Sequence, residues 1–227
     1  VVPPWRRDLA IEADIAEEIA RVRGYELVPG TLPDTPMPRY RPSITAVRDV
    51  VRAALVGAGL AEVVTHALVA PEALEAYRLR RPVLSLDDPD PEPTPIRVTN
   101  PLSSLHSVLR QNLLPSLVDV VVLNLRRGRP GVAVFEVGKG YGRAATGPVE
   151  WWRLGIALCG VAHPPSPLLP RRSFDLDDAK GLVEHLAAML GYGAPTFAVE
   201  DAEPVFHPGR TARVTAALDH GAGGLGL

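Results

Sequence analysis

The sequence predicts an α+β fold, in which an antiparallel or mixed sheet is flanked by helices. The expected strands follow one another or are separated by helices without strict alternation, and the chain has no internal repeat. This order favours such a sheet over a doubly wound parallel one. The 227 residues, 46% of them hydrophobic, are enough to bury a core.

A proline-rich segment near the N-terminus predicts two units. Residues 29–42 contain five prolines among small and charged residues, which is typical of an extended connection. We place the boundary there, with a partial small α/β domain in residues 1–38 and the main core in residues 39–227. Because the chain lacks an initiator methionine, we expect it to be a fragment of a longer protein.

Helices on both sides of this connection are predicted from apolar spacing. The first covers residues 14–23, with Ile15, Ile19 and Val22 on one face and Gly24 at its end. The second follows Ser43, a good N-cap residue, and stops at glycines 57 and 59. Its apolar stripe consists of Ile44, Val47, Val51, Ala54 and Leu55.

The remaining elements are expected in a mixed order along the core. A helix from Pro115 to about Leu125 has a wide apolar face, which predicts deep burial, and it is closed by Arg126, Arg127 and Gly128. A short helix begins at Pro71, and another covers residues 177–190. Strands are expected at 61–69, 83–86, 96–99, 132–137, 152–161, 196–199 and 210–218, with an exposed acidic loop at 87–95.

Composition excludes several classes of protein. The formal net charge of −2 and pI near 6.3 disfavour a protein whose whole surface binds nucleic acid. The single cysteine, Cys159, excludes an intrachain disulfide and a cysteine metal cluster. No apolar stretch reaches the roughly 20 residues that span a bilayer, and the start has no signal-peptide pattern, so we expect a cytoplasmic protein.

Several motifs carry a resemblance to a known family. They are PWRRDL at 4–9, DIAEEIARVRGY at 14–25, NPLSS at 100–104, LRQNLLP at 109–115, FEVG at 135–138 and FHPGR at 206–210. In this order and spacing they resemble the beta chain of bacterial phenylalanyl-tRNA synthetase. The resemblance implies a class II aminoacyl-tRNA synthetase-like antiparallel sheet, preceded by the end of a magnesium-coordinating domain.

The resemblance also implies a role and partners. The beta chain of this family is non-catalytic and supports assembly of a heterotetramer that attaches phenylalanine to tRNA(Phe) with ATP. The implied partners are the alpha subunit, which uses the ATP, a second beta subunit, and tRNA(Phe) through the assembled enzyme. The family's N-terminal RNA-binding, editing and anticodon-binding regions have no counterpart in this sequence.

Four carboxylates are candidate magnesium ligands: Asp8, Asp14, Glu17 and Glu18. The matching positions in the family bind magnesium, and carboxylate oxygens are what this cation prefers. The alternative is ordinary helix chemistry, because Asp14 and Glu17 form a D-x-x-E capping pattern and Glu17 can pair with Arg21. Both interpretations remain open at this point.

The segment from Phe135 to Ala144 resembles the second motif of class II synthetases in a degenerate form. That motif ends in aromatic-Arg-x-Glu, where the arginine meets the α-phosphate of ATP. Here the two charged positions are Gly142 and Ala144, and Arg143 is one residue out of register. In a strand this shift points the side chain to the opposite face. The candidate region comprises Phe135, Glu136, Gly138, Gly142 and Arg143, and we expect no amino-acid activation.

The helix after Ser43 resembles the first class II motif, through which such cores associate. We expect Val47, Val50 and Ala54 to contribute to a subunit interface, since Val50 and Ala54 extend the apolar surface beyond one packing face.

Alternatives from other classes are a stand-alone class II amino-acid-activating enzyme and a nucleic-acid-binding module. The first needs a working second-motif arginine and a third motif, and the second is disfavoured by the pI.

The histidines 66, 106 and 207 lack metal-ligand spacing, and His207-Pro208-Gly209-Arg210 predicts a tight turn.

Overall fold

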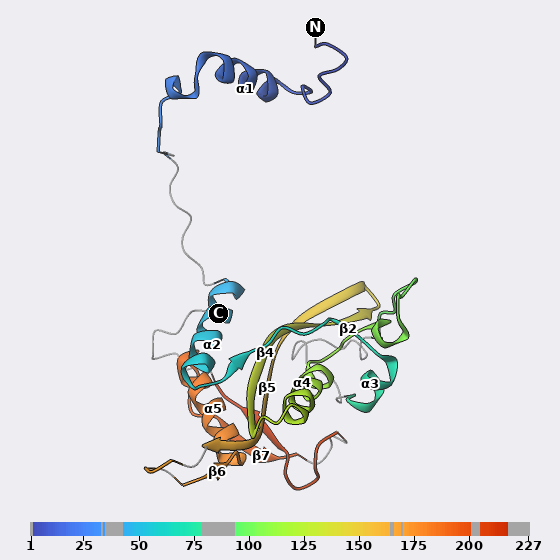
Figure 1. Cartoon of the computed structure of the whole chain (residues 1–227), viewed down its shortest axis with the longest axis vertical. Helices are drawn as coiled ribbons and strands as arrows, with labels where there is room; N and C mark the ends of the chain where they lie inside the picture. The colour runs from blue at the N-terminus through green and yellow to red at the C-terminus, as the bar shows by residue number, and fades with distance from the viewer. Residues whose placement is uncertain are drawn as a thin grey trace. The chain divides into compact units, whose positions relative to one another are not determined.

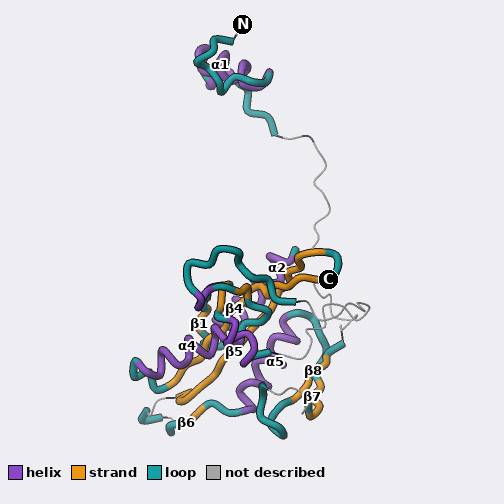
Figure 2. Tube along the Cα trace, turned by 90° about the vertical axis from the view of Figure 1, so that its right-hand side faces the viewer, coloured by secondary structure: helices purple, strands orange, loops and turns teal. Residues whose placement is uncertain are grey.

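The computed structural model describes residues 2–32, 34, 43–78, 94–163, 166–168, 170–200 and 205–217. The chain divides into two compact units, Val1–Tyr40 and Arg41–Leu227, drawn in Figures 1 and 2. The division lies two residues from the boundary placed from the prolines. The strand expected at 83–86, most of the loop at 87–95 and residue 218 lie outside the described residues.

Unit 1 contains the helix α1 (Glu12–Arg23) and a 3-10 turn, η1 (Tyr25–Leu27). The helix begins two residues before the predicted start. It ends at Gly24, which has a φ of 105° and whose amide donates a hydrogen bond to the Ala20 carbonyl. None of its residues is buried: Ile15 is 47% exposed and Val22 81%. The predicted apolar stripe is therefore present, and nothing among the described residues of unit 1 covers it.

Unit 2 holds the remaining elements. Its helices are α2 (Ile44–Gly57), α3 (Pro71–Ala76), η2 (Ser104–His106), α4 (Leu114–Arg126) and α5 (Leu176–Met189). Its strands are β1 (Ala61–Glu62), β2 (Leu68–Val69), β3 (Val108–Leu109), β4 (Gly131–Ala144), β5 (Gly147–His163), β6 (Arg172–Ser173), β7 (Thr196–Val199) and β8 (Ala212–Thr215).

Most element predictions agree with the structure, and two strands differ. Ser43 caps α2 as expected, its Oγ accepting a hydrogen bond from the Ala46 amide over 3.3 Å. The single strand expected at 61–69 is wrong, because β1 and β2 pair with different strands and belong to separate sheets. The strand expected at 96–99 is reduced to an isolated bridge between Arg97 and Val108.

The main sheet confirms the α+β prediction. Its strand order is β1-β4-β5-β6, with β1 parallel to β4 and the other neighbours antiparallel. The β4–β5 hairpin dominates it, pairing continuously from Gly131 with Gly160 to Ala144 with Gly147. Both strands run past the limits predicted from their apolar cores.

Helices cover both faces of this hairpin. In Figure 1, α2 and α5 lie on one side of β4–β5 and α4 on the other. On the first side the fully buried Phe135 packs with Leu55 and Leu186, and on the second side Val134 packs with Leu117. Neighbouring residues of β4 thus serve different cores, as the alternation of a strand requires.

The deep burial predicted for the helix α4 is wrong for its second half. Only residues 115–117 of α4 are buried, while Val122 is 37%, Leu123 47% and Leu125 39% exposed. The apolar face is wide, but its burial decreases along the helix: Val120 and Val121 are only partly buried against the sheet core. Periodicity identifies an apolar helix face without showing how far the sheet extends beneath it.

Glycines let the segment before α4 lie directly on the hairpin. A Cβ at Gly140 would stand 2.3 Å from the Gln111 carbonyl oxygen and 2.5 Å from Nε1 of Trp151. The first neighbour is backbone, so it cannot yield by a rotamer change.

We therefore expect Gly140→Ala to destabilise unit 2 by about 1–3 kcal/mol, the usual cost of overpacking. The matched control is Gly181→Ala in α5, where a Cβ meets nothing within 4 Å. There the change should stabilise by about 0.5–1 kcal/mol, because alanine favours a helix. Urea unfolding measures both, and equal effects would contradict this packing account.

Candidate functional site

A buried ion pair lies on the α4 side of the hairpin. Arg110 precedes α4 and is 4% exposed, and Glu136 is on β4 and is 2% exposed. The Arg110 Nη2 donates a hydrogen bond to Glu136 Oε1 over 2.8 Å. Such a pair is costly to desolvate, so its remaining donors and acceptors need partners.

Neighbouring groups supply those partners. Thr65, between β1 and β2, accepts from Arg110 Nη1 over 2.7 Å and donates its hydroxyl to Glu136 Oε2 over 2.6 Å. The Arg110 Nε donates to the Lys139 carbonyl over 3.0 Å. A Cβ at Gly138 would lie 2.5 Å from Arg110 Nη2, so glycine makes room for the guanidinium. The cluster ties three chain segments together.

The candidate second-motif residues lie along β4 as an alternating row. Phe135 is fully buried on the α2 side, whereas Glu136, Gly138 and Gly142 are buried positions on the other side. Arg143 is exposed, and its backbone pairs with Thr94 through hydrogen bonds of 2.9 and 3.0 Å. The buried face therefore carries no arginine at position 142. The partner of Glu136 was missed from sequence, although Arg110 is a lone charge in an apolar stretch.

Two adjacent tryptophans on β5 carry cations on opposite faces of the sheet. The guanidinium of Arg48, on α2, lies 4.1 Å from the Trp152 ring centre, and the Lys139 Nζ lies 5.2 Å from it. On the other face the Arg153 guanidinium lies 5.8 Å from the Trp151 ring. Burial lowers the pKa of Arg153. The Arg48–Trp152 contact joins α2 to the hairpin, and no sequence motif predicted any of these contacts.

The structure modifies the predicted interface on α2. Val47 and Val50 are half-buried, but Ala54 is 4% exposed and belongs to the core that surrounds Phe135. Ala54 thus packs within its own unit and is withdrawn from the expected contact surface. The apolar residues that α2 does expose are Ile44, at 52%, and Val56, at 56%.

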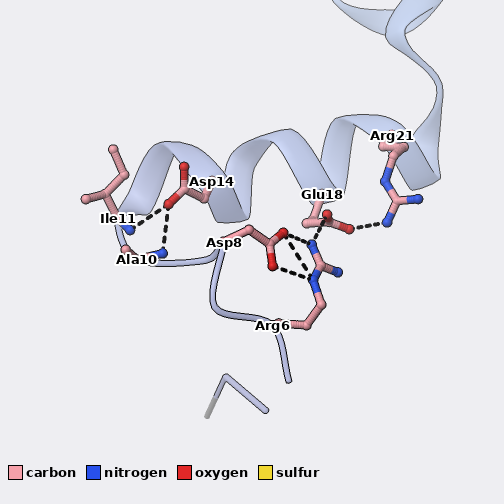
Figure 3. A network of polar contacts seen from close by, with 7 residues as sticks. All are labelled: Arg6, Asp8, Ala10, Ile11, Asp14, Glu18 and Arg21. Atoms are coloured by element: carbon pink, nitrogen blue, oxygen red, sulfur yellow. Dashed lines mark hydrogen bonds and ion pairs between the residues drawn. The ribbon is translucent and has the colours of Figure 1, made fainter. Parts of the chain in front are cut away.

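The N-terminal carboxylates are engaged by arginines and amides (Figure 3). Arg6 lies between Asp8 and Glu18: its Nη2 is 2.7 Å from Asp8 Oδ2, and it also pairs with Glu18, which Arg21 contacts as well. The hydrogen bonds from Arg6 and Arg21 lower the pKa of Glu18 to about 2, and the Arg6 guanidinium lowers the pKa of Asp8. The pairing expected between Glu17 and Arg21 is taken by Glu18 instead.

Asp14 has a different task. Its Oδ2 accepts hydrogen bonds from the Ile11 and Ala10 amides, each over 2.8 Å, and these bonds lower its pKa. It therefore caps the first turn of α1, while Glu17 is exposed. Among the described residues, no group of three or more histidine, cysteine, aspartate or glutamate side chains is placed to hold a metal ion. Arginines therefore engage two of the four predicted carboxylates and backbone amides a third, and magnesium binding by this group stays a prediction.

The tight turn predicted at His207 is confirmed. Gly209 has a φ of 76°, and the Arg210 amide donates to the His207 carbonyl over 3.0 Å. His207 therefore belongs to a turn that precedes β8.

Comparison with known families assigns both units. Residues 28–226 match the family model described as "Phenylalanyl tRNA synthetase beta chain CLM domain", and residues 1–25 match that of the "tRNA synthetase B5 domain". The chain belongs to the phenylalanyl-tRNA synthetase beta chain family. The family that its motifs resemble is confirmed.

Relatives described as phenylalanine–tRNA ligase beta subunit include those of Symbiobacterium thermophilum, 38% identical over 93% of this chain and 23% of the relative, and Xanthomonas campestris pv. campestris, 37% identical over 94% and 26%. The chain thus spans about a quarter of the length of these relatives. A solved pyrrolysyl-tRNA synthetase from Desulfitobacterium hafniense superposes with a TM-score of 0.48, at 16% identity, over 89% of this chain and 64% of that one.

We expect Glu136→Gln to destabilise unit 2 by about 3–5 kcal/mol, because it leaves the buried Arg110 charge without a counter-charge. The double variant Arg110→Met with Glu136→Leu should recover much of that loss, since both charges are then gone. Thermal or urea unfolding measures both. If the single and double variants lose equal stability, the pair is not acting as a charge pair.

Proposed function

We propose that this chain is a non-catalytic part of a phenylalanine–tRNA ligase beta subunit, acting as a scaffold on which the active enzyme assembles. The observation that carries this proposal is the arrangement of the second-motif residues along β4. Position 142 faces the buried side of the hairpin without a side chain, and Arg143 stands exposed in backbone pairing with Thr94. A phosphate-binding guanidinium must be held in a set position, and β4 holds none there.

The proposed partners are the alpha subunit, a second beta subunit and, through the assembled enzyme, tRNA(Phe). On this proposal the alpha subunit carries the reaction of phenylalanine with ATP, in the cytoplasm. Among the described residues no helix has the length and apolar composition needed to cross a bilayer. The half-buried Val47 and Val50 on α2, with the exposed Ile44, are the proposed contact surface.

We expect this chain to copurify with a co-expressed alpha subunit, and Val50→Glu to weaken the association at least tenfold, because a charge would be buried in an apolar contact. Thr45→Glu is the matched control: Thr45 is exposed in the first turn of α2, where an acidic residue is favourable. Sedimentation velocity of the mixtures measures both. Without the alpha subunit, the chain should self-associate through the same surface.

Two outcomes contradict the scaffold proposal. In the first, the chain stays monomeric at tens of micromolar, does not bind the alpha subunit and is unaffected by Val50→Glu. This result would show that α2 carries no assembly surface. Phenylalanine-dependent ATP–pyrophosphate exchange by the chain alone, lost in Arg143→Ala, supports the stand-alone ligase instead. The nucleic-acid-binding alternative has no support in the net charge of −2.

We propose a separate test of magnesium at Asp8, Asp14, Glu17 and Glu18. The ion would have to displace Arg6 from Asp8 and Glu18. Arg6→Gln should therefore strengthen magnesium binding, and Asp8→Asn with Glu18→Gln should remove it. Calorimetric titration measures both variants against the unmodified chain. Equal heats in all three would show that these carboxylates are not ligands.

A further inference from the structure

The outer edge of β5, on the side away from β4, is largely unpaired in the described part of unit 2. β6 meets this edge only at Val161 and His163, and the Phe174 amide donates to the Gly160 carbonyl just before them. From residue 148 to residue 159, no described strand pairs with the edge. A long free edge can pair with another chain, so proteins usually cover or protect such edges.

Alternate residues of β5 present their backbone groups at this edge. Phe135 on β4 gives its carbonyl to the Val63 amide, on the side away from β5, so the pair that it forms with Ile156 is not hydrogen-bonded. Ile156 therefore turns its own amide and carbonyl outward, as do the other even-numbered residues of β5. The outward residues are Pro148, Glu150, Trp152, Leu154, Ile156 and Leu158.

The two ends of this edge differ in how well they are protected. Pro148 has no amide hydrogen and Glu150 carries a charge, and both features discourage strand addition near the hairpin turn. From Trp152 to Leu158 the outward residues are all apolar, and Leu154 is 39% exposed. This stretch therefore lacks the protection that edge strands usually have.

The other face of the same stretch carries hydrogen-bond donors without acceptors. The Arg153 guanidinium is half-buried, no described carboxylate pairs with it, and its Nη2 is buried without a hydrogen bond. Trp151, 8% exposed, likewise has a buried Nε1 without a partner, and the Arg153 guanidinium lies 5.8 Å from its ring centre. Burial of an unpaired cation is unfavourable, which is why it lowers the pKa of Arg153. A carboxylate beside Arg153 would supply the missing counter-charge.

A second copy of β5 does not supply that charge. Antiparallel addition of another β5 would place its odd-numbered residues on the Arg153 face. Between 149 and 163 those residues are Val149, Trp151, Arg153, Gly155, Ala157, Cys159, Val161 and His163. None of them is acidic, so a second β5 leaves the Arg153 charge unpaired, which favours a strand of different sequence.

We propose that the outer edge of β5 binds an extended segment of a partner protein, in which an acidic residue is flanked by apolar residues. The backbone of the segment pairs with Trp152 and Leu154, and its apolar side chains lie beside theirs. Its carboxylate accepts hydrogen bonds from Arg153 on the other face. Arg153 would occupy a non-hydrogen-bonded position of the new pair, where side chains across two strands are closest. This inference does not depend on the proposed scaffold function, because it uses none of the proposed α2 contact residues.

The test is peptide binding to the full chain, measured by NMR titration and amide hydrogen exchange. The probe is the end-capped peptide Lys-Thr-Val-Glu-Val-Thr-Lys, whose side chains have the same order from either end, so that either strand direction is tested. At saturating peptide we expect exchange at the outward amides of Trp152 and Leu154 to slow by about tenfold or more. The amides of Arg153 and Gly155 already face β4 and should not change.

Matched peptides separate backbone pairing from charge. N-methylation of both valines removes the amides that would face β5 and should weaken binding by about tenfold or more. N-methylation of the glutamate and one threonine, whose amides face away, should leave binding unchanged. Replacing the glutamate by glutamine should weaken binding about fivefold, and in the Arg153→Gln variant this replacement should make no difference.

Arg129→Gln, which removes an exposed arginine between α4 and β4, is the control and should leave the affinity for every peptide unchanged. Equal binding of the two N-methylated peptides overturns the proposal, and so does equal binding of the glutamate and glutamine peptides by the unmodified chain. Strong protection of the Trp152 and Leu154 amides before any peptide is added also overturns it, because the chain itself or a second copy then covers the edge.

Discussion

The Arg110–Glu136 pair sets how the segments of unit 2 cross one another. Glu136 belongs to the central hairpin, Arg110 to the chain entering α4, and Thr65 to the chain leaving β1, and each needs the other two for its hydrogen bonds. Apolar residues of similar volume can equal such a pair in stability. A buried charged pair differs from such apolar residues in one respect. It tolerates only one alignment of the crossing segments, because shifting one segment leaves a buried charge unpaired.

The glycines of the hairpin follow from this crossing. With Arg110 lying against β4, a side chain at Gly138 would occupy the space of the guanidinium, and one at Gly140 would strike the next backbone carbonyl. On the adjacent strand, a Cβ at Gly155 would stand 2.4 Å from Leu117. The hairpin face is thus filled by its own chain up to the first turn of α4. Beyond that turn Val120 and Val121 are only partly buried against the sheet, and Leu123 and Leu125 near the end of α4 are exposed.

Local chemistry made much of this fold predictable from sequence. The Ser43 cap, the Gly24 terminus and the Pro71 helix start each depend on a few neighbouring residues. The failures depend on contacts distant in sequence. Glu136 finds Arg110 26 residues away, the 61–69 segment is divided between two sheets, and Ala54 is claimed by its own core. Periodicity in the sequence shows which face of a helix or strand is apolar, but the tertiary contacts determine which residues cover that face.

The candidate metal site shows that sequence spacing is equally limited as a guide to which charged groups pair. Spacing places four carboxylates near the start of α1, but spacing does not say which cations compete for them. Arg6 reaches both Asp8 and Glu18 and lowers the pKa of each, so these carboxylates are ionised and already neutralised. Magnesium releases its waters reluctantly and gains little from a carboxylate that a guanidinium holds in a hydrogen-bonded fork. We therefore expect Arg6, a residue that no metal-ligand pattern includes, to decide whether the cluster binds the ion.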